Sequence, residues 1–163
     1  MISILESLFL GLIASLAALF AEALAFTLVT WNDSPWTFNY DSLLVSSKFI
    51  LAFVAIEEIA KFFFISKQIV NFPSKWLGTF HAAVIGLGFA GIESLIVYQR
   101  LHQSLTGYWL PVSGIFMVHV MTSFILGVFL AQRWKLWITA PIALAITIGL
   151  HFAYNLNVMA HLQ

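Results

Sequence analysis

Long apolar stretches separated by short polar connections make up almost the whole chain. A membrane-spanning helix needs about 20 apolar residues, and the stretches that reach this length lie at about 4–30, 48–67, 76–99, 110–132 and 136–160. Turn-forming residues mark the connections, namely 31–41, Asn71-Phe-Pro-Ser-Lys75, Gln103-Ser-Leu-Thr-Gly107 and 132–135. The pattern predicts an all-α integral membrane protein, a single bundle of about five transmembrane helices that occupies residues 1–163.

The composition supports this class. Hydrophobic residues make up 61% of the chain and charged residues only 9%, whereas a soluble domain carries about 25% charged residues. The net charge is zero and no basic run occurs, so we expect the lipid bilayer and no nucleic acid as a partner. The absence of cysteine excludes disulfides and a cysteine nucleophile. The first stretch has no basic region before it and no clear cleavage site after it, so it is predicted to be a retained helix.

Lysine and arginine counts in the connections predict the orientation in the membrane. The second and fourth connections are the basic ones, and they hold Lys67, Lys75, Arg133 and Lys135. The first and third hold only Lys48 and Arg100. We therefore expect a multi-pass membrane protein with its amino terminus on the cytoplasmic side.

Ionisable side chains interrupt the apolar stretches. Glu57, Glu58 and Lys61 stand together within the second stretch, between two apolar runs. A charge near the centre of a bilayer costs roughly 2.5–3.5 kcal/mol on insertion scales, so three charges in one span require a reason. The later stretches carry Glu93, His119 and His151.

These side chains are predicted to lie at a common depth. Counted from the predicted outer end of each span, Glu57 is nine residues in, Glu93 seven, and His119 and His151 about nine. At about 1.5 Å of rise per residue, all four lie roughly 10–14 Å below the outer interface. One ionisable residue alone is as often a packing contact as a functional group. The agreement of four separate segments is what indicates a site.

Helical spacing predicts which residues share a face, because positions three and four apart stack on one side of a helix. Lys61 is within reach of both Glu57 and Glu58, which point about 100° apart. Asn155 shares the face of His151, one turn nearer the outside. On the other polar spans, Thr122 and Ser123 share the face of His119, and Gly86, Phe89 and Ala90 share that of Glu93.

Other features have simpler interpretations. Gly11-x-x-x-Ser15 is a small-residue pattern that predicts a close helix contact. His81 is expected at the cytoplasmic interface. Glu22 reaches a depth similar to that of the site, but no motif surrounds it.

The residue types limit the chemistry. The His-Glu-x-x-His pattern of zinc peptidases is absent, no serine stands in a Gly-x-Ser-Gly sequence, and Asp33 and Asp41 both lie in a connection. Glutamate, histidine and asparagine remain, and together they can hydrolyse an amide with water as the nucleophile. A carboxylate accepts the water proton, an imidazole positions the water or the carbonyl, and N–H groups stabilise the oxyanion.

The order of these elements resembles the PrsW family of membrane proteases, which is related to the CAAX prenyl endopeptidases and to bacterial immunity proteins. The elements are Glu57-Glu58-x-x-Lys61, Gly88-Phe-Ala-x-x-Glu93, His119 and His151-x-x-x-Asn155, within residues 50–156. The family usually has asparagine and tyrosine where this chain has Ser94 and Val97.

The resemblance implies an intramembrane peptidase that cleaves a membrane-anchored protein substrate on its extracytoplasmic side. By the same resemblance, Glu57 is the general base, His151 and Asn155 form the oxyanion pocket, and Glu93 and His119 complete the water site. Glu58 and Lys61 complete the first motif. No cofactor is expected on this interpretation.

Three alternatives remain open. A zinc-dependent variant would use Glu93, His119 and His151 as ligands and Glu57 as the base. A non-catalytic scaffold or immunity-type protein would use the same polar groups to bind a partner, although such a role does not need both Glu57 and Glu93. A proton-coupled carrier is disfavoured because no internal repeat is visible.

Overall fold

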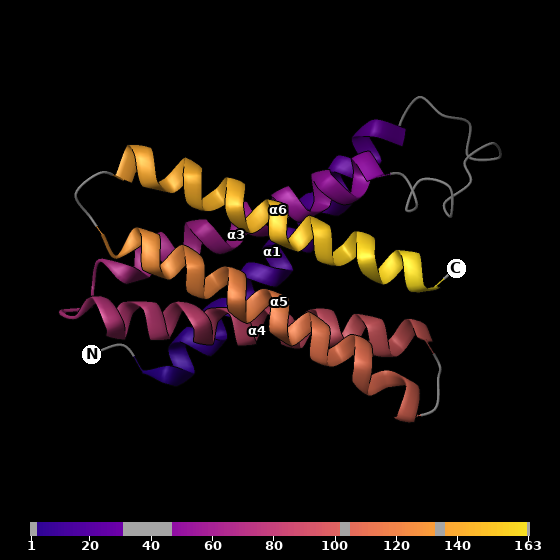
Figure 1. Ribbon diagram of the computed structural model, residues 1–163, viewed down its shortest axis with the longest axis horizontal. Helices are drawn as coiled ribbons and strands as arrows, with labels where there is room; N and C mark the ends of the chain where they lie inside the picture. Colours follow the sequence, from indigo (N-terminus) through magenta and orange to yellow (C-terminus); the bar gives the residue numbers. More distant parts are fainter. Residues whose placement is uncertain (1–2, 31–46, 102–104, 133–135, 163) are drawn as a thin grey trace.

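Figure 1 shows the computed structural model, which describes residues 3–30, 47–101, 105–132 and 136–162. Every regular element within these residues is a helix: α1 (Ile4–Thr30), α3 (Ser47–Ile69), α4 (Lys75–Leu101), α5 (Leu105–Leu130) and α6 (Leu136–Leu162). The predicted all-α bundle is therefore confirmed. The connection predicted at 31–41 lies outside the described residues, as do three residues of the connection at 132–135.

The helix boundaries follow the apolar pattern with one clear difference. Helix α3 ends at Ile69, and a turn leads to α4 at Lys75, as expected from Pro73 in the connection. Helix α5 begins at Leu105, so residues 105–107 belong to the helix and not to the predicted connection. One glycine costs a helix only about 1 kcal/mol, so Gly107 is not enough to keep these residues out of it.

Four of the helices contain stretches long and apolar enough to cross a membrane: Ile4–Leu28, Lys75–Gln99, Val112–Leu130 and Ile138–Met159. Helix α3 has a comparable length of 23 residues, but three charged side chains occupy its middle. It contacts each of the other four described helices. Its charged groups can therefore lie inside the bundle, where neighbouring helices supply partners.

Small residues bring the helix backbones close together. A methyl group added at Gly11 of α1 would lie 2.1 Å from the carbonyl oxygen of Ile85, and one added at Gly88 of α4 would lie 2.2 Å from that of Leu8. Ser15, one turn after Gly11, is also buried. The contact predicted from Gly11-x-x-x-Ser15 is thus the crossing of α1 over α4 (Figure 1).

Apolar side chains form clusters inside the bundle, and they also cover much of its outer surface. The largest core cluster is formed by α3, α4, α5 and α6 and includes Ile65, Ile85, Leu126 and Leu130. Large apolar side chains also cover the outside, among them Phe9, Phe20, Phe63, Phe80 and Met117. An exposed apolar surface of this kind suits acyl chains as solvent, consistent with a membrane protein.

Candidate functional site

A buried lysine is at the centre of the polar residues. The Lys61 ammonium nitrogen on α3 lies 2.5 Å from Glu58 Oε1 and 2.6 Å from Thr122 Oγ1 on α5. It also lies 3.2 Å from His119 Nδ1. An ammonium group has three N–H donors, so each donor has an acceptor. This is how the bundle holds a charge whose side chain is completely buried.

Two bonds set the orientation of His119. Because the Lys61 ammonium can only donate, His119 Nδ1 is the acceptor, and the ring proton is on Nε2. That nitrogen is hydrogen-bonded to Glu93 Oε2 on α4. The two helices approach closely because Gly86, two turns before Glu93, has no side chain: a methyl group there would lie 2.5 Å from the His119 carbonyl oxygen. The absence of a side chain at Gly86 thus lets α4 and α5 lie close enough for Glu93 to reach His119.

His151 on α6 contacts both glutamates of the α3 pair. Its Nδ1 lies 2.8 Å from Glu58 Oε1 and 3.4 Å from Glu57 Oε2. Since Nδ1 faces carboxylates, it carries the ring proton in the neutral imidazole, and the lone pair is on Nε2. Nε2 is buried and has no hydrogen-bond partner among the described residues. His151 thus has one ring nitrogen held by the protein and one available to a small ligand.

Glu57 differs from Glu58 in its surroundings. The Glu58 side chain is completely buried and is held by Lys61 and His151. The Glu57 side chain is 15% exposed and lies on the wall of a pocket of about 230 Å³. The other polar side chains that line this pocket are Glu22 and Asn155. The structure therefore assigns the lysine partner to Glu58 and leaves Glu57 facing open space.

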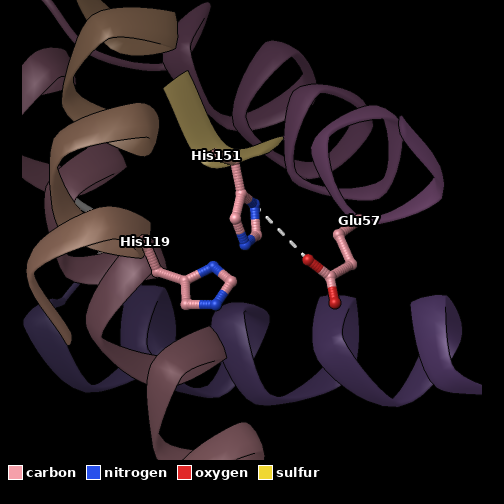
Figure 2. Close-up of side chains that lie close together, drawn as sticks. All are labelled: Glu57, His119 and His151. Carbon is pink, nitrogen blue, oxygen red and sulfur yellow. Dashed lines mark ion pairs between the residues drawn. The ribbon is translucent and has the colours of Figure 1, made fainter. Parts of the chain in front are cut away.

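Figure 2 shows the arrangement of Glu57, His119 and His151, which come from three different helices. Each offers one ligand atom, and these atoms lie within 4.8 Å of one another. The three side chains thus converge on one position beside the pocket that Glu57 lines.

The same residues are also chemically suited to zinc, which accepts histidine nitrogen and carboxylate oxygen as ligands. Both ring nitrogens of His119 already have partners, Lys61 and Glu93, so His119 would have to give up one of them to bind the ion. The grouping differs from the expected ligand set in one member. Glu57 joins the two histidines, whereas Glu93 is bonded to His119.

The structure brings together every residue selected from the sequence. One connected set of contacts joins Glu57, Glu58, Lys61, Glu93, His119 and His151. Asn155 lines the same pocket as Glu57. Two further residues belong to this region. Thr122 had been placed on the His119 face by its spacing, and Glu22 of α1 had no motif to identify it, only its depth.

His81, which was expected at the cytoplasmic interface, is packed against neighbouring helices near the end of its own helix. Its side chain is buried, and Nδ1 lies 2.6 Å from Ser7 Oγ. Ser7 in turn accepts a hydrogen bond of 2.7 Å from Gln68 Nε2. The ring of Phe72 stacks on the imidazole. Partners on α1 and α3 therefore keep this histidine inside the bundle.

Comparison with known proteins gave no match, since no family model, no curated protein and no solved structure matches this chain. The likeness to the PrsW family therefore depends on the four sequence elements, and the chemistry of the site depends on its geometry.

Proposed function

We propose that this protein is an intramembrane endopeptidase that hydrolyses a peptide bond of a membrane-anchored protein substrate. The observation that carries the proposal is the convergence of Glu57, His119 and His151 beside a pocket, with Nε2 of His151 unpartnered among the described residues. Water held there would lie beside a carboxylate that has no lysine partner. Such a carboxylate is suited to act as a general base.

In the proposed reaction, Glu57 accepts a proton from the water, and the water oxygen bonds to the carbonyl carbon of the substrate. The Asn155 amide, which lines the same pocket, donates to the oxyanion, and His151 does so when both of its ring nitrogens carry protons. The proton is then transferred to the departing amine nitrogen as the C–N bond breaks.

The remaining polar groups act on the site indirectly. Glu93 fixes the ring of His119, and Glu58 fixes the ring of His151. Lys61 compensates the charge of Glu58. With the amino terminus inside, the site is in the outer half of the membrane, which favours cleavage on the extracytoplasmic side. The proposed location is a bacterial-type plasma membrane.

The test uses purified protein in detergent micelles with fluorescein-labelled casein and a set of labelled single-span membrane proteins as probes. Glu57→Gln and His151→Ala are expected to abolish cleavage while the protein still elutes as a folded species. Glu6→Gln is the matched control, because Glu6 is exposed near the start of α1. Normal turnover in either purified site variant would contradict the mechanism, and would favour the scaffold alternative.

The zinc-dependent variant is a second candidate, favoured by the grouping of Glu57 with two histidines. Bound zinc would supply a Lewis acid and an activated water. Loss of cleavage on chelation, with recovery on addition of zinc, would establish this candidate. Full activity after exhaustive chelation, with no zinc detected in the purified protein, would exclude it.

A further inference from the structure

The pocket beside Glu57 has a second acidic side chain, contributed by the first helix. Ala14 and Ala18 are buried against α3 and α4, and Glu22 follows Ala18 by four residues on the same face of α1. Because the alanines allow α1 to lie close to α3, the carboxyl group of Glu22 comes within hydrogen-bonding reach of Glu57. Packing of small residues therefore places this acid at the site.

Glu57 Oε2 lies 3.4 Å from His151 Nδ1, but neither Glu22 nor Glu57 has a lysine or arginine partner among the described residues. Glu22 Oε1 and Glu57 Oε2 are both inaccessible to solvent and have no hydrogen-bond partner among the described residues. Lys61, the nearby lysine, has its three donors directed at Glu58, Thr122 and His119. No lysine or arginine side chain lines the pocket within the described residues. Buried carboxyl oxygens without donors are unfavourable, so a cation at this position would be stabilised.

The rest of the pocket is apolar. Side chains of Ile50, Phe53 and Val54 on α3 and of Val158 and Met159 on α6 form its other walls. At about 230 Å³ it is smaller than the 300–1,000 Å³ typical of sites for whole small molecules. An occupant with an apolar stem and a cationic end fits this combination. Lysine and arginine side chains have that form.

The pocket lies between two helices that are separated from each other, and a substrate could enter there. Helices α1 and α6 each pack on α3 but do not contact each other within the described residues. The pocket has lining residues from all three helices, so it lies where α1 and α6 are separated over α3. A polypeptide in extended form that enters between α1 and α6 would place one side chain in the pocket and the adjacent peptide bond near Glu57.

We propose that Glu22 determines substrate specificity by binding a lysine or arginine side chain next to the peptide bond that is cleaved. This inference rests on the proposed peptidase function. Glu22 supplies the carboxylate for the cation, and the apolar walls contact the stem of the side chain. Glu57 keeps its role as the base.

The experiment is a cleavage profile. Purified protein in detergent micelles is incubated with a synthetic peptide pool randomised at several consecutive positions, and the cut sites are read by mass spectrometry. For the unmodified protein, we expect lysine and arginine to be enriched about tenfold at one fixed position relative to the cut, as a close ion pair would give. In the products of Glu22→Gln, lysine and arginine should fall to the frequency of neutral residues at that position, and Glu6→Gln should retain the enrichment.

The outcomes separate this inference from the proposed function. If basic residues show no positional enrichment, or if the enrichment persists in Glu22→Gln, the specificity role is wrong and the peptidase function stands. If Glu57→Gln cleaves the pool normally, both are wrong. Should Glu22→Gln fail to fold, Glu22→Asp decides: its shorter side chain should reduce the enrichment several-fold, and an unchanged profile would overturn the inference.

Discussion

The Lys61 ammonium nitrogen and Glu58 Oε1 lie 2.5 Å apart, and both side chains are completely buried. This pair connects α3 to two other helices, because Lys61 also contacts Thr122 and His119 on α5, and Glu58 contacts His151 on α6. It also separates the roles of two adjacent glutamates. Glu58 is paired with Lys61, whereas Glu57 lines the pocket.

Replacing Lys61 with methionine should destabilise the fold. The substitution keeps most of the side-chain volume but removes the positive charge beside buried Glu58, and breaking such a pair costs about 3–5 kcal/mol. We expect a clear fall in the midpoint of thermal or denaturant unfolding in detergent. Lys67→Met is the matched control, because Lys67 is exposed near the end of α3, and it should have little effect. An unchanged midpoint for Lys61→Met would show that the pair is not ionised.

The sequence predicts most of the arrangement through the apolar pattern. Span lengths fix the approximate depth of each residue, and this was enough to group Glu57, Glu93, His119 and His151. The sequence could not show which glutamate contacts Lys61. Glu57 and Glu58 are four and three residues before it, and either spacing permits contact. That choice depends on how α3 is rotated against α5 and α6, which is decided by tertiary packing.

Glu22 and His81 are two further residues whose partners could not be predicted from the sequence. Glu22 had the right depth, but its relevance depends on α1 lying close to α3, and this follows from long-range packing of Ala14 and Ala18. His81 had the depth of an interfacial residue, yet Ser7 and Gln68 give it buried partners. Depth can be read from one span at a time, whereas partners require knowledge of which helices are neighbours.

The glycine at the crossing of α1 and α4 should not tolerate a side chain. A methyl group at Gly88 would lie 2.2 Å from the Leu8 carbonyl oxygen, which belongs to the backbone and can move only if the helix moves. Gly88→Ala is therefore expected to lower the free energy of unfolding by about 1–3 kcal/mol. Unfolding of the purified variant in detergent measures this.

Gly149→Ala provides the control for that substitution. Apart from the surrounding helix backbone, no atom of the described residues lies within 4 Å of a methyl group at this position of α6. Alanine is favoured over glycine in a helix by about 0.8–1.0 kcal/mol. The control should be neutral or slightly more stable than the unmodified protein. Equal effects of the two substitutions would mean that α1 and α4 do not cross as closely as described.

The hydrogen bonds among Ser7, Gln68 and His81 predict a structural role that is independent of catalysis. Gln68 is eleven residues beyond Glu57 on α3, or about 16 Å along the helix, so these side chains lie far from the proposed reaction. In Ser7→Ala, the His81 imidazole and the Gln68 amide would each lose a buried partner, at a cost of about 1–3 kcal/mol. We expect a lower midpoint temperature of unfolding and, at temperatures below it, normal cleavage of labelled casein. Ser66→Ala, which removes a hydroxyl bonded only within its own helix, should change neither quantity. Loss of cleavage in Ser7→Ala with an unchanged midpoint would instead mean that this buried serine and histidine take part in the activity.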